Sequence, residues 1–215
     1  MENCIEKTIL FVKKQLENAE GGHDWFHIER VYKNSLLIAK TENCNEIVVQ
    51  LGALLHDIAD SKFHNGDETL GPKLARNFLE SENISEEIII EVVNIIENIS
   101  FKGGNFDNKF TSKELEIVQD ADRLDAIGAI GIARAFNYGG FKNRLLYNPE
   151  VVPNLQMSKE EYKNSNAPTI THFYEKLLLL KDKMNTETGK KIAQNRHQYM
   201  EVFLKQFFDE CDGVL

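Results

Sequence analysis

The chain has 215 residues, enough for one domain with a full hydrophobic core or at most two small ones. Its 25 basic and 34 acidic residues give a formal net charge of −9, which argues against a nucleic-acid polymer as partner because such binding rests mainly on Lys and Arg. The three cysteines lie far apart, which predicts no disulfide framework and a cytoplasmic location. The N-terminal stretch does not read as a signal peptide, and no apolar run is long enough for a membrane span.

Helical periodicity runs through the whole sequence and predicts an all-α fold, with a single domain over residues 1–215. The β-branched stretch after Ser85 is also predicted to be helical, because its acids recur at helical spacing and the run exceeds typical strand length. The predicted helices are one ending near Gly21-Gly22, followed by about 23–41, 45–60, 68–80, one from Ser85 onward, one leading from Thr111 toward Asp120, and about 170–184 and 188–211. Residues 101–109 are expected to form a surface loop, and 138–167 a long irregular segment that could act as a flap.

Several local signals refine these helices. Asn45 is a predicted helix cap, and Thr111 with Glu114 reads as a capping box. Gly128 and Gly131 would each weaken a helix by about 1 kcal/mol relative to Ala, so close helix contact is their expected use. The residues predicted to face inward in the second helix are Phe26, Val31, Leu37 and Ile38.

The dipeptide His56-Asp57 stands at the polar end of a predicted helix that is otherwise apolar. Adjacent helical residues point about 100° apart, so both must face one polar cavity or one must be exposed. A buried carboxylate normally finds a cation or a metal ion. A helix end at which Asp57 caps or is solvated explains the pair equally well, and these two residues alone do not decide between the two interpretations.

A second group of polar residues, His23, His27 and Arg30, shares one helix face. Two histidines at this spacing can bind zinc in HExxH enzymes, but Asp24 follows His23 and the Glu of that motif is missing. Taken alone, His27 is more often a hydrogen-bonded, half-buried histidine than a metal ligand.

Three acids, Asp120, Asp122 and Asp125, cluster with Arg123 before a segment of small apolar residues. If they occupy the first turn of a helix, the helix dipole stabilises them without any ligand. Their mutual repulsion would also be relieved by a bound cation, and mixed oxygen and imidazole ligands suit Mn, Fe, Mg or Zn.

Together these segments resemble one family. The order His27, then His56-Asp57, then Asp122 is similar to the H…HD…D signature of the HD-domain superfamily of metal-dependent phosphohydrolases. The stretches HIERV, ALLHDIADSK and DADRLDAIGAIGIARAF resemble a bacterial subgroup of short, single-domain HD proteins, the YpgQ/YedJ type. The resemblance covers about residues 20–145 and is looser beyond. It implies an HD-domain/PDEase-like helical bundle on which C-terminal helices of about 169–211 pack.

The resemblance also implies one divalent metal ion bound by His27, His56, Asp57 and Asp122, with positions left for water and substrate. The metal could be Mn, Mg, Fe, Ni or Zn, and manganese is among the expected ions. The spacing of the histidines does not clearly provide the extra ligands of two-metal HD proteins, so the site is expected to be mononuclear.

Further roles follow from the same resemblance. Asp60 matches a catalytic carboxylate that orients water or passes a proton, and Lys62 is expected to act beside it on a phosphate oxygen. The expected substrate-binding residues are Arg30, Lys62, His23, Arg123, Arg134 and Tyr138, with His64 near the mouth of the site. Simpler roles remain open: Arg30 could pair with Asp24, Arg123 could be solvated, and Arg134 could serve a helix C-terminus.

The expected substrate is a small phosphorylated molecule. The subgroup resemblance implies a nucleotide, with a nucleoside triphosphate split into a monophosphate and pyrophosphate. Another HD phosphomonoesterase, a phosphodiesterase or a ppGpp hydrolase stays open because the ligand set is common to all of them. A metal-dependent nucleotide sensor, a purely structural metal and a homodimer are further alternatives.

Residues outside the motif receive simpler predictions. His172 and His197 are predicted to lie at the surface. The aromatic residues near the irregular segment could form a base-stacking wall, although core packing is the commoner fate of aromatic residues at helical spacing; they are Phe136, Tyr138, Phe141 and Tyr147.

Overall fold

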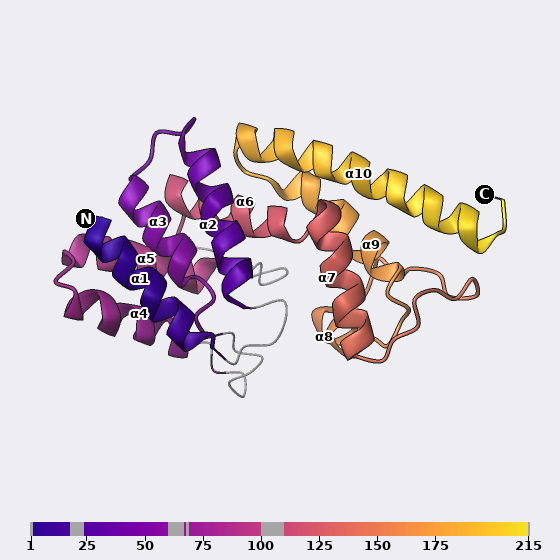
Figure 1. The fold of residues 1–215 in the computed structure, drawn as a ribbon, viewed down its shortest axis with the longest axis horizontal. Helices are drawn as coiled ribbons and strands as arrows, with labels where there is room; N and C mark the ends of the chain where they lie inside the picture. The colour runs from indigo at the N-terminus through magenta and orange to yellow at the C-terminus, as the bar shows by residue number, and fades with distance from the viewer. Residues whose placement is uncertain (1, 18–23, 60–66, 68, 100–109, 215) are drawn as a thin grey trace. The chain divides into compact units, whose positions relative to one another are not determined.

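A computed structural model describes residues 2–17, 24–59, 67, 69–99 and 110–214 of the chain (Figure 1). Every regular element in these ranges is helical, which confirms the all-α prediction. The chain divides into two compact units, Met1–Asp122 and Arg123–Leu215, and helix α6 (Lys113–Asp125) runs across the boundary. The single domain expected from the sequence stays a prediction. None of the described helices is long and apolar enough to cross a membrane.

The first unit is a helical bundle with α3 at its centre. Its helices are α1 (Glu2–Gln15), α2 (Trp25–Ala39), α3 (Glu46–Leu55), α4 (Leu70–Ser81), α5 (Glu86–Asn98) and most of α6. Helix α3 contacts α1, α2 and α5, and Val48, Leu51 and Leu55 are among its fully buried side chains. A helix that is apolar on nearly all sides is stable only when its neighbours surround it, as they do here.

Close packing and a few polar contacts join the helices of this unit. A Cβ atom on Gly52 would lie 3.1 Å from Cδ1 of Ile95, so glycine lets α3 and α5 approach closely. The Tyr32 hydroxyl on α2 donates to Oε1 of Gln50 on α3 at 2.8 Å. Stacked rings on α1 and α4 complete this side of the bundle, with Phe11 and Phe78 centroids 4.2 Å apart.

One of the two predicted caps is confirmed. Oδ1 of Asn45 accepts a hydrogen bond from the Ile47 N–H, so Asn45 caps α3. The capping box of Thr111 with Glu114 is wrong, because Oγ of Ser112 accepts the Leu115 N–H at the start of α6. The Glu114 carboxylate instead reaches across to the backbone N–H of Asn45, at 2.6 Å, and thereby joins the starts of α3 and α6.

The inward face of α2 is narrower than the sequence suggested. Val31 and Ile38 are buried as predicted, whereas Phe26 and Leu37 are exposed. Leu37 lies eleven positions after Phe26, so at about 100° per residue both side chains point in nearly the same direction, away from the buried stripe. Helix α3 also ends at Leu55 rather than near Asp60, and α5 is helical as predicted.

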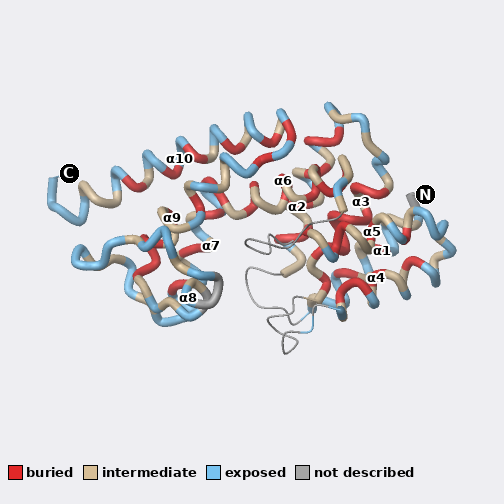
Figure 2. Tube along the Cα trace, turned by 180° about the vertical axis from the view of Figure 1, so that it is seen from behind, coloured by how far each residue is buried: buried red, intermediate tan, exposed pale blue. Residues whose placement is uncertain are grey.

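The second unit is organised along the longest helix, α10. Its elements are α7 (Gly128–Phe141), α8 (Lys159–Asn164), α9 (Thr171–Glu175), the 3₁₀-helix η2 (Leu177–Lys183) and α10 (Glu187–Cys211). One side of α10 is buried and packs on α7 and η2, as its alternating colours in Figure 2 show. In place of the single helix predicted over 170–184, the structure has two short helices, α9 and η2, separated at Lys176. The segment 138–167, predicted to be irregular, includes the end of α7 and all of α8, and is irregular between them and after α8.

An aromatic cluster forms the core of this unit. The Phe136 ring on α7 lies 5.9 Å from that of Phe173, 6.0 Å from Phe203 and 6.1 Å from Phe207, measured between centroids. Tyr147 packs against the same cluster, at 6.0 Å from Phe207. Core packing is thus confirmed for Phe136 and Tyr147, whereas Tyr138 and Phe141 stay exposed.

The two histidines predicted to lie at the surface are not there. His197 is buried on the inner side of α10. The His172 ring stacks on Tyr162, whose hydroxyl contacts Nδ1, and burial lowers the pKa of His172 to about 3. Both histidines lie on helix faces that pack inward, and the sequence near the C-terminus did not show which helix faces these would be.

The two glycines of α7 both serve close contacts. Gly128 has a φ of +75°, and a Cβ there would lie 3.0 Å from the Arg196 side chain on α10, so the predicted helix contact is confirmed. At Gly131 the neighbour is the backbone of Ala126 rather than another helix, with 2.2 Å from the added Cβ to the carbonyl oxygen.

The aromatic core predicts a large loss of stability on truncation. Phe173 is 0% exposed and Phe141 is 66% exposed. Phe173→Ala should lower the free energy of unfolding by about 3–5 kcal/mol, since it removes a buried ring and leaves a cavity. Urea unfolding followed by circular dichroism measures the loss, and Phe141→Ala is the matched control with an expected change within about 0.5 kcal/mol. Equal losses in the two variants would contradict the assignment of the core.

A carboxyl pair in the first unit predicts a pH dependence of stability. Burial raises the pKa of Glu91, and its hydrogen bond to Glu114 and the charges of Glu114 and Glu87 act in the same direction, against a hydrogen bond from Ser112. Because this pKa is higher in the folded chain, the folded state binds the proton more tightly. The resulting stabilisation is present below the unfolded pKa and is lost as the pH rises through the folded pKa.

Glu91→Gln should therefore raise the melting temperature at about pH 7 and have little effect at about pH 4. Thermal unfolding at both pH values checks this, with the exposed Glu97→Gln on the same helix as control. A shift of the same size at both pH values would show that the carboxyl pair does not carry the dependence.

Candidate metal centre

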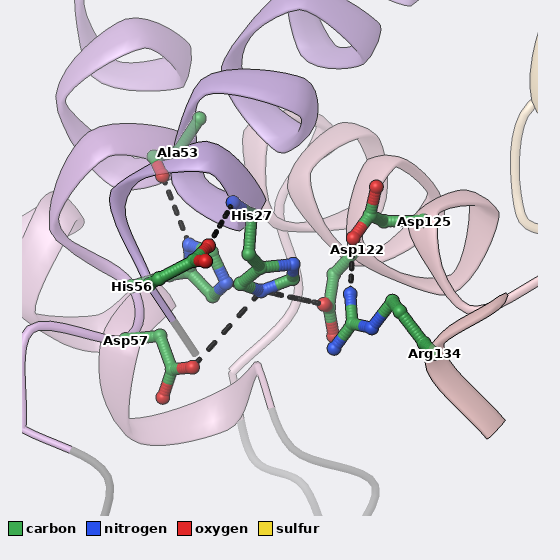
Figure 3. A network of polar contacts seen from close by, with 8 residues as sticks. His27, Ala53, His56, Asp57, Asp122, Asp125 and Arg134 are labelled. Carbon is green, nitrogen blue, oxygen red and sulfur yellow. Dashed lines mark hydrogen bonds and ion pairs between the residues drawn. The ribbon is translucent and has the colours of Figure 1, made fainter. Parts of the chain in front are cut away.

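Three ligand-type side chains from α2 and from the turn after α3 converge in the first unit (Figure 3). One ligand atom from each of His27, His56 and Asp57 lies within 4.8 Å of the others. No other group of three such residues was found in the described part of the chain. The two segments that the sequence singled out separately thus meet at one place.

Helix α2 places His27 through its N-cap. Oδ1 of Asp24 accepts a hydrogen bond from the His27 N–H at 3.0 Å, which fixes the first turn of the helix. The His27 ring is buried. Asp24, which the sequence suggested as a partner of Arg30, is therefore a residue that positions the site, and an Asp three residues before His27 is the capping signal that could have shown it.

A backbone carbonyl orients His56 at the C-cap of α3. Nδ1 of His56 lies 2.9 Å from the Ala53 oxygen, and because a carbonyl oxygen only accepts, Nδ1 carries the proton. Nε2 then keeps its lone pair. This Nε2 atom is buried and has no hydrogen-bond partner among the described residues. A histidine whose other nitrogen donates to a carbonyl is the usual arrangement of an imidazole ligand.

Asp122 of α6 brings a fourth ligand-type side chain to the same place. Its Oδ1 lies 3.5 Å from Nε2 of His27 and 3.9 Å from Nε2 of His56, while Oδ2 of Asp57 lies 4.0 Å from Nε2 of His27. Two donors bound to one divalent ion at about 2.1 Å lie roughly 3–3.5 Å apart, so the four groups need to move only a little to hold one ion.

The four side chains differ in their access to solvent. The two imidazoles are buried, whereas the side chains of Asp57 and Asp122 are 18% and 39% exposed. The imidazoles thus form the floor of the site and the carboxylates its solvent-facing side. Such a site can keep positions open for water and a substrate, as catalytic metal sites do.

The acids around Asp122 lie at the end of a helix and not in a first turn. Asp122 and Asp125 belong to the last turn of α6, and the fully buried Asp120 lies in the turn before it. The prediction that the helix dipole alone stabilises these carboxylates is wrong, because the C-terminal end of a helix is negative. These acids therefore require nearby positive charge, which a bound metal ion or neighbouring arginine side chains can supply.

Arginines of the second unit supply part of this positive charge. Arg134 of α7 forms an ion pair with the buried Asp125 (Figure 3). Arg196 of α10 donates to the Leu124 carbonyl at 2.5 Å. Burial lowers the pKa of Arg196, and the charge of Asp125 partly opposes this shift. The sequence did not reveal the Asp125–Arg134 pair, because nothing in a single chain indicates which of several arginines meets which acid.

The expected substrate-binding residues have varied surroundings. Arg30 lies on α2, one turn after His27, and is half-buried. Arg123 donates to the Lys183 carbonyl oxygen at 2.6 Å. Arg134 is paired as described, and Tyr138 is exposed on α7. The structure therefore gives Arg123 and Arg134 contacts within the protein and leaves the substrate roles of all four residues as predictions.

Four further residues lie outside the described ranges. They are His23, Asp60, Lys62 and His64. Their expected roles, as catalytic residues for Asp60 and Lys62 and at the substrate for His23, remain predictions from the sequence.

Comparison with known proteins gives a consistent family. The family profile of the HD domain matches residues 25–127. The chain is 34% identical over 210 residues to the Bacillus subtilis protein YpgQ, covering 97% of this chain and 94% of that protein. Among solved structures, an HD-superfamily hydrolase from Bacillus thuringiensis is similar with 44% identity, a TM-score of 0.78 and coverage of 98% of each chain.

The crystal structure of Bacillus subtilis YpgQ in complex with ADP is also similar, with 33% identity and a TM-score of 0.78 over 97% of this chain and 95% of that one. These likenesses extend over nearly the whole length of both chains and include the segments that carry His27, His56-Asp57 and Asp122. The protein therefore belongs to the HD-domain superfamily, among its YpgQ-type members.

Proposed function

We propose that this protein is a metal-dependent phosphohydrolase that acts on a nucleotide, splitting a nucleoside triphosphate into a monophosphate and pyrophosphate. His27, His56, Asp57 and Asp122 would hold one divalent ion. Manganese is the first ion to test, because mixed imidazole and carboxylate ligands suit it. The observation that carries the proposal is the buried Nε2 of His56, which has no hydrogen-bond partner in the described part of the chain and lies near Nε2 of His27 and the carboxylate of Asp122.

An unpartnered buried nitrogen is costly unless a ligand uses its lone pair. A bound metal ion would supply a reactive water at neutral pH and neutralise the charge of phosphoryl oxygens. The chain's own part is to orient the donors: Ala53 fixes the tautomer of His56, and Asp24 fixes the start of the helix that carries His27. The exposed side of Asp57 and Asp122 leaves room for substrate to approach.

A nucleotide is the proposed substrate class because a similar protein, YpgQ, was crystallised with ADP. The net charge of −9 does not oppose this choice, since a divalent ion would reverse the sign of the field at the site. Asp60 is proposed to orient the attacking water or pass its proton, and Lys62 to hold a phosphate oxygen. His23, Arg30, Arg123, Arg134 and Tyr138 stay proposed substrate contacts, and cytoplasmic location and a homodimer stay predictions.

The metal centre predicts a separation of activity from stability. Asp57→Asn should abolish nucleotide hydrolysis and lower Mn²⁺ affinity by about tenfold or more, because an amide is a far weaker ligand than a carboxylate. Metal content after dialysis and product release are the two measurements, with Asp182→Asn as a matched control at an exposed position. If Asp57→Asn lost folding stability but kept turnover, the metal would be structural and the proposal wrong.

The proposed catalytic role of Asp60 predicts a loss of turnover without a loss of binding, and the proposed reaction predicts which products are released. Asp60→Asn should reduce kcat by about 10²-fold or more while metal and nucleotide affinities stay close to those of the wild type. Product analysis of the wild type should find pyrophosphate and a nucleoside monophosphate. Orthophosphate as the first product would instead identify a phosphomonoesterase, and unchanged kcat would remove Asp60 from the mechanism.

A further inference from the structure

One polar contact joins α5 and α6 close to the candidate metal centre. Nε2 of Gln119 on α6 donates a hydrogen bond to the carbonyl oxygen of Asn98, the last residue of α5, at 3.0 Å. Gln119 precedes Asp122 by three residues, so the two side chains lie on one side of α6, one turn apart. These three residues belong to the first unit, which also contains the other three proposed metal ligands.

Asp122 reaches the two imidazoles from the last turn of α6 (Figure 3). Its Oδ1 lies 3.5 Å from Nε2 of His27 and 3.9 Å from Nε2 of His56, and its side chain is 39% exposed. A divalent ion holds its donors at about 2.1 Å, so a shift of this turn by about 1 Å changes whether Asp122 can share an ion with the histidines. The rotation and register of α6 therefore decide what Asp122 contributes.

The buried face of α6 does not by itself fix this turn. Ile117, Val118 and Ala121 are fully buried, and a Cβ added to Gly52 would lie 3.6 Å from Cγ2 of Val118, so this face packs on α3. The hydrophobic effect that holds such a face has no preferred direction. A hydrogen bond weakens steeply when its angle departs from linearity, so it restrains rotation and sliding of a helix more sharply.

The contact with Asn98 supplies such a restraint close to the proposed ligand. The bond from the Asn45 N–H to Glu114, at 2.6 Å, restrains the start of α6, but it lies eight residues before Asp122, about two turns away. The acceptor end is itself ordered, because Nδ2 of Asn98 donates to the Asn94 carbonyl at 2.8 Å. Helix α6 is therefore joined to an ordered point on α5 one turn before Asp122.

We propose that Gln119 is a positioning residue of the metal centre: its hydrogen bond to α5 sets the last turn of α6 and thereby aims Asp122 at an ion held by His27 and His56. The inference rests on the proposed function for the metal site. A simpler role for Gln119 is to cap α5, since the last four carbonyls of a helix lack a partner within it. Capping alone predicts a loss of stability, whereas removing a residue that orients a ligand lowers metal affinity by about 10–100-fold.

Gln119→Met tests the inference, because methionine has nearly the shape of glutamine and cannot donate a hydrogen bond. The matched control is Gln50→Met, which removes another half-buried contact between helices of the same unit, the 2.8 Å bond from the Tyr32 hydroxyl. The full-length, metal-free protein is titrated with Mn²⁺, and the free ion is followed by its electron paramagnetic resonance signal. The Kd should rise about tenfold in Gln119→Met and stay within about twofold of the wild type in Gln50→Met. Thermal unfolding without metal should show comparable losses in the two variants.

Hydrogen exchange of the metal-free protein gives a second measurement that needs neither metal nor activity. Backbone amides of residues 119–125 should exchange about threefold faster or more in Gln119→Met than in the wild type, because the end of α6 is less restrained. Gln50→Met should leave their exchange unchanged. Gln119→Ala, which also lacks the donor, should repeat the pattern of Gln119→Met in both measurements.

The outcomes separate this inference from the proposed function. Wild-type Mn²⁺ affinity in Gln119→Met, or an equal loss of affinity in Gln50→Met, would overturn the positioning role even if the wild type hydrolyses nucleotides. If Gln119→Met shows the expected pattern while the wild type hydrolyses no nucleotide, the role of Gln119 stands and the proposed reaction fails. A wild type that binds no Mn²⁺ would overturn both.

Discussion

The hydrogen bond between Nδ1 of His56 and the Ala53 carbonyl is the interaction on which the candidate site depends. It fixes the tautomer, and so decides that the lone pair of Nε2 faces His27 and Asp122. Helix α3 ends at Leu55, so His56 follows directly after the helix, and its ring contacts the Ala53 carbonyl of the last turn. The apolar sides of α3 in turn lock the helix among its neighbours, so packing far from the site holds one ring nitrogen in place.

Electrostatics at the end of α6 imposes the second constraint. Three acids gather where the helix dipole is negative, and burial of Asp120 and Asp125 removes the solvent that would otherwise screen them. Arg134 forms an ion pair with Asp125, and the half-exposed Asp122 points toward the two imidazoles. The last turn of α6 therefore carries two acids with different surroundings: Asp125 is paired with an arginine, and Asp122 lies beside the two imidazoles, where it could bind an ion.

The predictions from sequence succeeded where one residue type carried the information. Asn45 caps α3 and α5 is helical, since each of these signals was a short pattern with its own physical cause. His27, His56 and Asp57 lie close together as the order of the family signature implied, although the local patterns left their roles open. They were wrong where several faces or partners competed. Ser112 rather than Thr111 caps α6, and Glu114 accepts the Asn45 N–H instead of completing a capping box. His172 and His197 lie on sides of their helices that pack inward.

The sequence by itself determined the all-α class and the family, and it named the candidate ligands of a divalent ion, because helical periodicity and the order of such residues are properties of the chain. Only the tertiary structure decided which end of a helix the acids of residues 120–125 occupy, that Arg134 meets Asp125, and which nitrogen of His56 is left without a partner. The reason is physical: these facts depend on contacts between residues distant in sequence, and on burial, which converts a polar side chain from a solvated group into one that needs a specific partner.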